Sequence, residues 1–117
     1  MFKKSLIALT LALAAAGAQA AYWSGHLLND LVEENSDSAR MASYGFIAGV
    51  VDTNAGEWLC IPGAVTLGQM RDVVKAYMRD NPEMRHQSAA VLVTVALFKP
   101  WGCADKKNAA KKSGKMM

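Results

Sequence analysis

The sequence of 117 residues has little of the chemistry that builds metal or catalytic sites. It contains two cysteines and two histidines, and these show neither a CxxC nor an HxxxH spacing, which argues against a zinc site. The imidazoles of His26 and His86 have no acid–base partner that their spacing suggests. Gly45 and Gly49 are not followed by the Lys and Ser or Thr of a phosphate-binding loop. The sequence therefore predicts a binding protein without metal or cofactor rather than an enzyme.

The chain also lacks an apolar run long enough to span a bilayer, which takes about 20 residues. A shorter run at residues 6–16 follows Lys3 and Lys4 and precedes the small residues Ala18 and Ala20. A positive start, a short apolar stretch and small residues before a cleavage point are typical of a secretory signal peptide. An uncleaved membrane anchor is the alternative. We expect residues 1–20 to be a signal peptide cleaved after Ala20, a periplasmic location, and a mature protein without a membrane span.

Acidic side chains are absent from residues 106–117, which hold five lysines. All ten acidic side chains and six basic ones lie in residues 21–105, so the net charge of +3 hides an acidic body and a basic tail. An excess of basic over acidic side chains often indicates a nucleic-acid partner. Here the tail has too few apolar groups to fold, and export argues against nucleic acid as well. We predict a Lys-rich disordered tail over residues 106–117 and no nucleic-acid partner.

Residues 21–105 form a single small domain, which buries only about two thirds of its unfolded surface and needs support. Cys60 and Cys103 both remain after cleavage, and an oxidising compartment allows a disulfide between them to persist. Closing a loop of about 43 residues contributes roughly 4 kcal/mol on chain-entropy grounds. Zinc ligation by the two thiols with His26 and His86 is the alternative. We expect the disulfide.

Helical periodicity dominates the mature chain, and strict alternation of an exposed strand is missing. Ser24 predicts the cap of a helix over residues 24–35, and the run at residues 36–38 caps a second helix over residues 39–54. This second helix contains Gly45 and Gly49, each of which costs about 1 kcal/mol against alanine. We expect another backbone to approach the helix closely at this glycine pair.

Two further helices follow. Thr66 and Gln69 fit a capping box that begins a third helix, which ends at Asp80. The sequence Asn81-Pro82-Glu83 predicts the start of a fourth helix over residues 82–98, with proline in the first turn. Its valine content makes a buried strand the alternative. We predict an all-α fold, a small four-helix domain closed by one disulfide.

Three segments together resemble a known family. YGFIAGVV at residues 44–51, WLCIPGAVTLGQMRDVVKAYMRDNPEMRH at residues 58–86 and an apolar helix closing on Trp101-Gly102-Cys103 are similar to the Rap/Tai family of immunity proteins. The resemblance implies an all-helical, often dimeric protein that serves type VI secretion systems in the periplasm. It implies binding to a secreted cell-wall amidase effector and occlusion of its substrate groove. Many members carry a second cysteine pair that this chain lacks, with Ser43 near one of the expected positions.

The candidate partner contacts are Glu57 and Trp58, in the connector over residues 57–65, together with Arg85 and His86. A tryptophan beside a rigid loop can anchor a partner, or it can simply cover the disulfide or the edge of the core. Arg85 and His86 can equally serve only to hold the fourth helix to its neighbour through hydrogen bonds. An acid-stress chaperone that exposes residues 89–98 at low pH is the alternative function, and an enzyme with an unrecognised site is a third.

Overall fold

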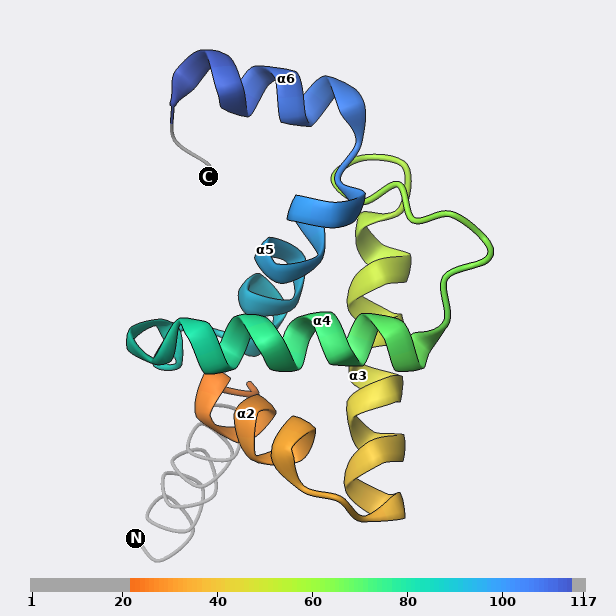
Figure 1. Ribbon diagram of the computed structural model, residues 1–117, viewed down its shortest axis with the longest axis vertical. Coiled ribbons are helices and arrows are strands. Elements are labelled where there is room, and N and C mark those ends of the chain that lie inside the picture. The colour runs from red at the N-terminus through yellow and green to blue at the C-terminus, as the bar shows by residue number, and fades with distance from the viewer. Residues whose placement is uncertain (1–21, 115–117) are drawn as a thin grey trace, which may run out of the picture.

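The computed structural model describes residues 22–114, and within them the chain forms five α-helices and a short 3-10 helix (Figure 1). In chain order these are α2 (Gly25–Glu33), α3 (Asp37–Asn54), α4 (Leu67–Asp80), η1 (Pro82–Met84), α5 (Ala89–Trp101) and α6 (Ala104–Ser113). The described part of the chain contains no β-strand, so the predicted all-α fold is confirmed, with five helices in place of four. The expected signal peptide lies outside the described residues. Among the described helices, none has the length and apolar character that a membrane crossing requires.

Helices α2 to α5 pack against one another around one core, and α6 stands at the end of the molecule away from α2 (Figure 1). Each of the four core helices places an apolar stripe inward, as amphipathic helices do. The largest fully buried apolar side chains come from these helices and from the loop after α3: Leu28, Val32, Ile47, Leu59, Val74, Met78, Leu92, Val93 and Leu97. Burial of each such leucine stabilises the fold by about 2 kcal/mol.

Helix α5 is the central element of the fold. Its residues were predicted to form a helix, with a buried strand as the alternative, and the prediction of a helix is confirmed. Its predicted start at Pro82 is wrong, because residues 82–84 form only the 3-10 helix η1. The Asn81 side chain gives no cap there and donates instead to the Tyr77 carbonyl at 3.0 Å. The N-cap residue of α5 is Ser88, whose hydroxyl accepts a hydrogen bond from the Val91 amide at 3.3 Å. The helix also runs through Pro100, one turn beyond the predicted end.

The start of α2 is joined to the start of α5. The Gly25 amide donates to the Gln87 carbonyl at 2.8 Å, and the Ala89 amide donates to the Trp23 carbonyl at 2.9 Å. A Cβ at Gly25 would collide with the Arg85 carbonyl oxygen, so glycine is required for this approach. Close backbone contact therefore does occur at a glycine, although not at the predicted pair.

The expected backbone approach at Gly45 and Gly49 is wrong for the described residues. A Cβ built at either position meets no atom within 4 Å. Both glycines instead line an open hollow of about 330 Å³ between α3 and the start of α5, together with Phe46 and Ala90. Phe46 is held in place by stacking on Trp23, with ring centroids 4.6 Å apart.

The prediction of a disordered tail from residue 106 is also wrong for residues up to Ser113, which belong to α6. Lysine and alanine are good helix formers, and acid in the first turn with lysine in the last suits the helix dipole. Gly114 ends the helix in the left-handed conformation with φ 66°, and its amide donates to the Ala110 carbonyl at 3.0 Å. The helix is stabilised further because Ala110 packs against the core.

Candidate functional site

A disulfide joins Cys60, in the loop after α3, to Cys103, just after α5, with the Cα atoms 4.9 Å apart. The predicted pairing is confirmed. Because the bond occupies both sulfur atoms, the alternative in which the two thiols ligate zinc is wrong. We call residues 57–65 the stapled loop, since the disulfide fixes this segment to the far end of the α5 helix.

Backbone hydrogen bonds reinforce the disulfide on both sides. The Cys60 amide donates to the Trp101 carbonyl at 2.8 Å, and the Cys103 amide donates to the Trp58 carbonyl at 3.0 Å. Between them Leu59 is 1% exposed and belongs to the core. Residues 58–60 and 101–103 are therefore held together by covalent, polar and apolar contacts at once. The following part of the loop projects from the side of the molecule between α3 and α4 (Figure 1).

Trp58 covers part of the core and is also partly exposed. Its ring lies 6.3 Å from the Phe98 ring at an interplanar angle of 57°, so it covers the edge of the core. It nevertheless stays 38% exposed, and its neighbour Glu57 is also exposed. The ammonium nitrogen of Lys106, on α6, lies 4.5 Å from the Trp58 ring centroid in a cation–π contact. A partially exposed aromatic on a rigid loop is thus presented beside a positive charge.

Arg85 contacts the protein rather than open solvent. Its Nε and Nη2 atoms donate to the Met78 carbonyl at 3.1 and 2.9 Å, which caps the end of α4. This matches the alternative in which Arg85 holds neighbouring helices together. His86 is exposed, and its Nδ1 lies 2.8 Å from the Glu83 carbonyl oxygen.

The four candidate residues do not form one patch. Arg85 and His86 precede the first turn of α5, whereas Glu57 and Trp58 lie beside its last turn. The 13 residues of α5 separate the two pairs by about 20 Å, at 1.5 Å per residue. The stapled loop and the His86 turn are therefore two separate surfaces.

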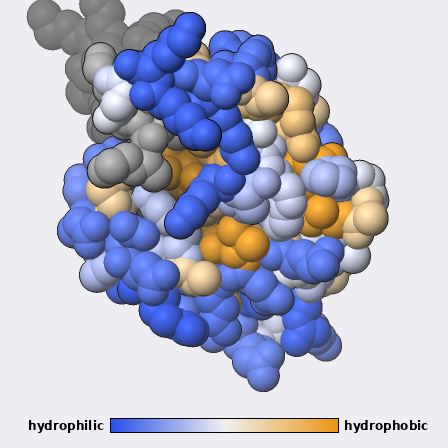
Figure 2. Space-filling view, turned by 45° about the horizontal axis from the view of Figure 1, so that its top comes forward, coloured by the Kyte–Doolittle hydropathy of each residue, from blue (hydrophilic) through white to orange (hydrophobic). Residues whose placement is uncertain are grey.

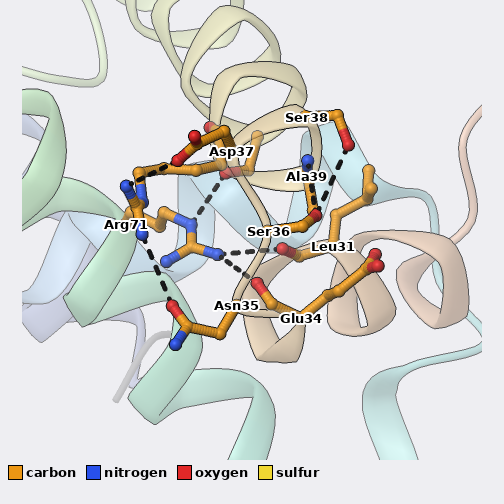
Figure 3. Close-up of polar contacts among 10 residues, drawn as sticks. Leu31, Glu34, Asn35, Ser36, Asp37, Ser38, Ala39 and Arg71 are labelled. Atoms are coloured by element: carbon orange, nitrogen blue, oxygen red, sulfur yellow. Dashed lines mark hydrogen bonds and ion pairs between the residues drawn. The ribbon is translucent and has the colours of Figure 1, made fainter.

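Arg71, on α4, has a role that the sequence analysis did not identify. The Arg71 Nε donates to the Ser43 hydroxyl at 2.8 Å, and Nη2 donates to the carbonyls of Leu31 and Glu34 at 2.9 and 3.2 Å (Figure 3). One guanidinium thus ties the end of α2 to α3 and α4. The available signal was the end of α2, which has no basic residue in its last turn to satisfy its carbonyls.

Tyr77, Asp80 and Lys99 line a hollow of about 420 Å³ between α4 and α5. Burial raises the pKa of the Tyr77 phenol above its ordinary value, and the negative charge of Glu83 raises it further. The phenol therefore keeps its proton at neutral pH.

Comparison with known proteins gives one family. The family model described as Rap1a immunity proteins matches residues 23–103, from the residue before the α2 cap to the second cysteine of the disulfide. No curated protein and no solved structure matches the chain. The match includes the stapled loop and stops where α6 begins.

Proposed function

Because the chain belongs to the Rap1a immunity proteins, we propose that it protects its cell by binding and inhibiting a type VI-secreted peptidoglycan amidase in the periplasm. The observation that carries this proposal is the family match over the whole of α2 to α5. In the proposed complex the immunity protein occludes the substrate groove of the effector, so that the enzyme cannot reach the cell wall.

The stapled loop supports the proposal as the contact surface. A binding loop that is already rigid loses little conformational entropy on association, and this favours high affinity. The disulfide and the two backbone hydrogen bonds supply that rigidity at Cys60 and Cys103. Tryptophan is among the residue types most enriched in energetically dominant interface contacts. Trp58 is partly exposed. Glu57 and Trp58 are therefore the proposed primary contacts, with His86 on a separate surface.

The proposed location follows from two features that agree. Residues 1–20 have the pattern of a secretory signal, and the Cys60–Cys103 disulfide is of the kind that persists in an oxidising compartment. The proposed assembly is a homodimer, as the family resemblance implies. Light scattering on the purified protein tests the dimer independently of effector binding.

The experiment is an inhibition assay with the amidase effector that co-purifies with the protein, purified peptidoglycan and the disulfide-bonded protein. We expect stoichiometric inhibition that Glu57→Arg and Trp58→Leu each weaken at least tenfold, because truncating a dominant contact costs about 2 kcal/mol or more. Asp30, on α2, is also an exposed acid, so Asp30→Arg is the matched control and should inhibit like the wild type. Trp58→Leu retains apolar contact with Phe98, and circular dichroism checks that the variant folds.

Two results would count against the proposal. Recovery of no cell-wall hydrolase when the protein is captured from cells with an active secretion system removes the amidase as the partner. If both loop variants inhibit the amidase fully and the Asp30→Arg control does not, the contact does not lie on the stapled loop.

A further inference from the structure

Charge in this molecule is segregated between the body and α6. Residues 22–103 carry nine acidic and six basic side chains. Helix α6 carries a single acid, Asp105, and four lysines: Lys106, Lys107, Lys111 and Lys112. The body is therefore net negative and the final helix net positive. Because α6 lies at one end of the molecule (Figure 1), this segregation gives the protein an electric dipole.

Helix α6 is a positioned element. It begins directly after Cys103, and the Lys107 amide donates to the Cys103 carbonyl at 3.0 Å. Lys106 lies over the Trp58 ring, and Ala110, four residues later on the same helix face, packs against the core. These contacts fix which side of α6 faces the body.

The remaining lysines of α6 lie to either side of that contact, and Lys107 is half-buried. Lys107 and Lys111 are four residues apart and share one face of the helix, and Lys111 and Lys112 are exposed. In the view of Figure 2, in which the top of Figure 1 comes forward, hydrophilic side chains cover α6. The exposed Lys111 and Lys112, with the half-buried Lys107, form a cationic edge, which we define as Lys107, Lys111 and Lys112.

The chemistry of the cationic edge fits an extended anionic surface. The helix has no apolar side chain larger than alanine, so it offers no anchor for a shaped apolar pocket. Lysine ammonium groups act as point charges and lack the bidentate geometry with which arginine recognises individual carboxylates or phosphates. Clustered lysines on a helix, with no requirement for shape, are attracted to the surface of an anionic bilayer.

We propose that α6 docks this protein on the surface of an anionic phospholipid bilayer through the cationic edge, with the acidic body turned away from the lipid. The negative body is repelled by the same surface that attracts α6, so the charge segregation also sets the orientation. Helix α6 lies outside the family match at residues 23–103, and the effector-binding proposal does not depend on it.

The test is co-sedimentation of the full disulfide-bonded protein with vesicles of equal parts phosphatidylglycerol and phosphatidylcholine, and with vesicles of phosphatidylcholine alone. We expect binding to the anionic vesicles only, and its loss when salt shortens the range of the attraction. Each lysine near the surface contributes about fivefold to the affinity, so the triple variant Lys107→Gln, Lys111→Gln, Lys112→Gln should bind roughly 100-fold more weakly.

The matched control removes three positive charges from the body by Lys75→Gln, Arg79→Gln and Lys99→Gln. Both triple variants have the same net charge, and circular dichroism checks that both remain helical. The control should bind the anionic vesicles nearly as tightly as the wild type. Absence of wild-type binding, equal weakening in both variants, or binding to purified peptidoglycan in place of the vesicles would each overturn the proposal, and none of these results bears on inhibition of the amidase.

Discussion

The Nε atom of Arg71 donates a 2.8 Å hydrogen bond to the hydroxyl of Ser43, which is fully buried. The two residues lie 28 positions apart in the sequence, on α4 and α3. Ser43 in turn donates to the Arg40 carbonyl at 2.8 Å, and the Arg71 Nη2 reaches the carbonyls at the end of α2 (Figure 3). The polar cluster therefore holds α2, α3 and α4 together.

Replacing Arg71 should destabilise the fold measurably. Arg71→Met removes charge-assisted hydrogen bonds and leaves the Ser43 hydroxyl without this donor, so the free energy of unfolding should fall by about 2–3 kcal/mol. Arg40→Met is the matched control. The Arg40–Asp37 ion pair, 3.3 Å long, is exposed, so its loss should change stability by about 0.5 kcal/mol or less. Urea denaturation measures both, and equal effects of the two variants would contradict the assigned role of Arg71.

The local parts of this structure could be predicted from the sequence because their signals lie within four residues. The Thr66–Gln69 capping box forms both of its hydrogen bonds, at 2.8 and 3.1 Å. The cysteine pair was predictable for a different reason, because the chain contains only two cysteines. At Asn81, however, the sequence offered a cap that the fold does not use. Tertiary contact between the starts of α2 and α5 selects Ser88 in its place.

The candidate site was predictable only in part, for the same reason. The disulfide followed from residue types and the expected compartment, whereas the sequence left open whether Trp58 covers the edge of the core or contacts a partner. The placement of Lys106 over that ring depends on how α6 leaves Cys103, which no local pattern encodes. Arg71 reaches α2 across 40 residues of sequence, so its partners are visible only once the helices are packed.

Loss of the disulfide should remove a large share of the stability. The double variant Cys60→Ala, Cys103→Ala frees a loop of 43 residues, which lowers the free energy of unfolding by about 4 kcal/mol. For a domain of this size the melting temperature should fall by roughly 20 °C. Reduction of the wild type should give the same stability, and reductant should leave the double variant unchanged. Two free thiols by mass spectrometry in protein isolated from its native cells without reductant would contradict the bond.

Glycine substitutions should have opposite signs at two positions. Alanine at Gly25 brings a Cβ into the Arg85 carbonyl and the Leu92 side chain, so Gly25→Ala should destabilise by about 1–3 kcal/mol. Gly45→Ala places its Cβ in open space on α3 and should stabilise by about 0.5–1 kcal/mol, because alanine favours the helix. Thermal and urea unfolding of both variants measure the difference. A destabilised Gly45→Ala protein would show that this face is covered in solution.

Tyr77 should make the fold sensitive to alkaline pH. Burial and the charge of Glu83 raise the pKa of the Tyr77 phenol in the folded protein, whereas in the unfolded chain the phenol titrates near its ordinary value of about 10. Above that value the unfolded chain loses the proton first, so the contribution of Tyr77 to stability falls as pH rises toward the folded pKa. Tyr77→Phe removes the titrating phenol and with it this dependence of stability on pH. We expect the stability of the variant relative to wild type to be constant between pH 7 and 9 and to increase above pH 10, as measured by urea denaturation. A constant difference across the whole range would mean that the phenol titrates alike in both states, and ultraviolet absorbance of the folded protein provides the independent check.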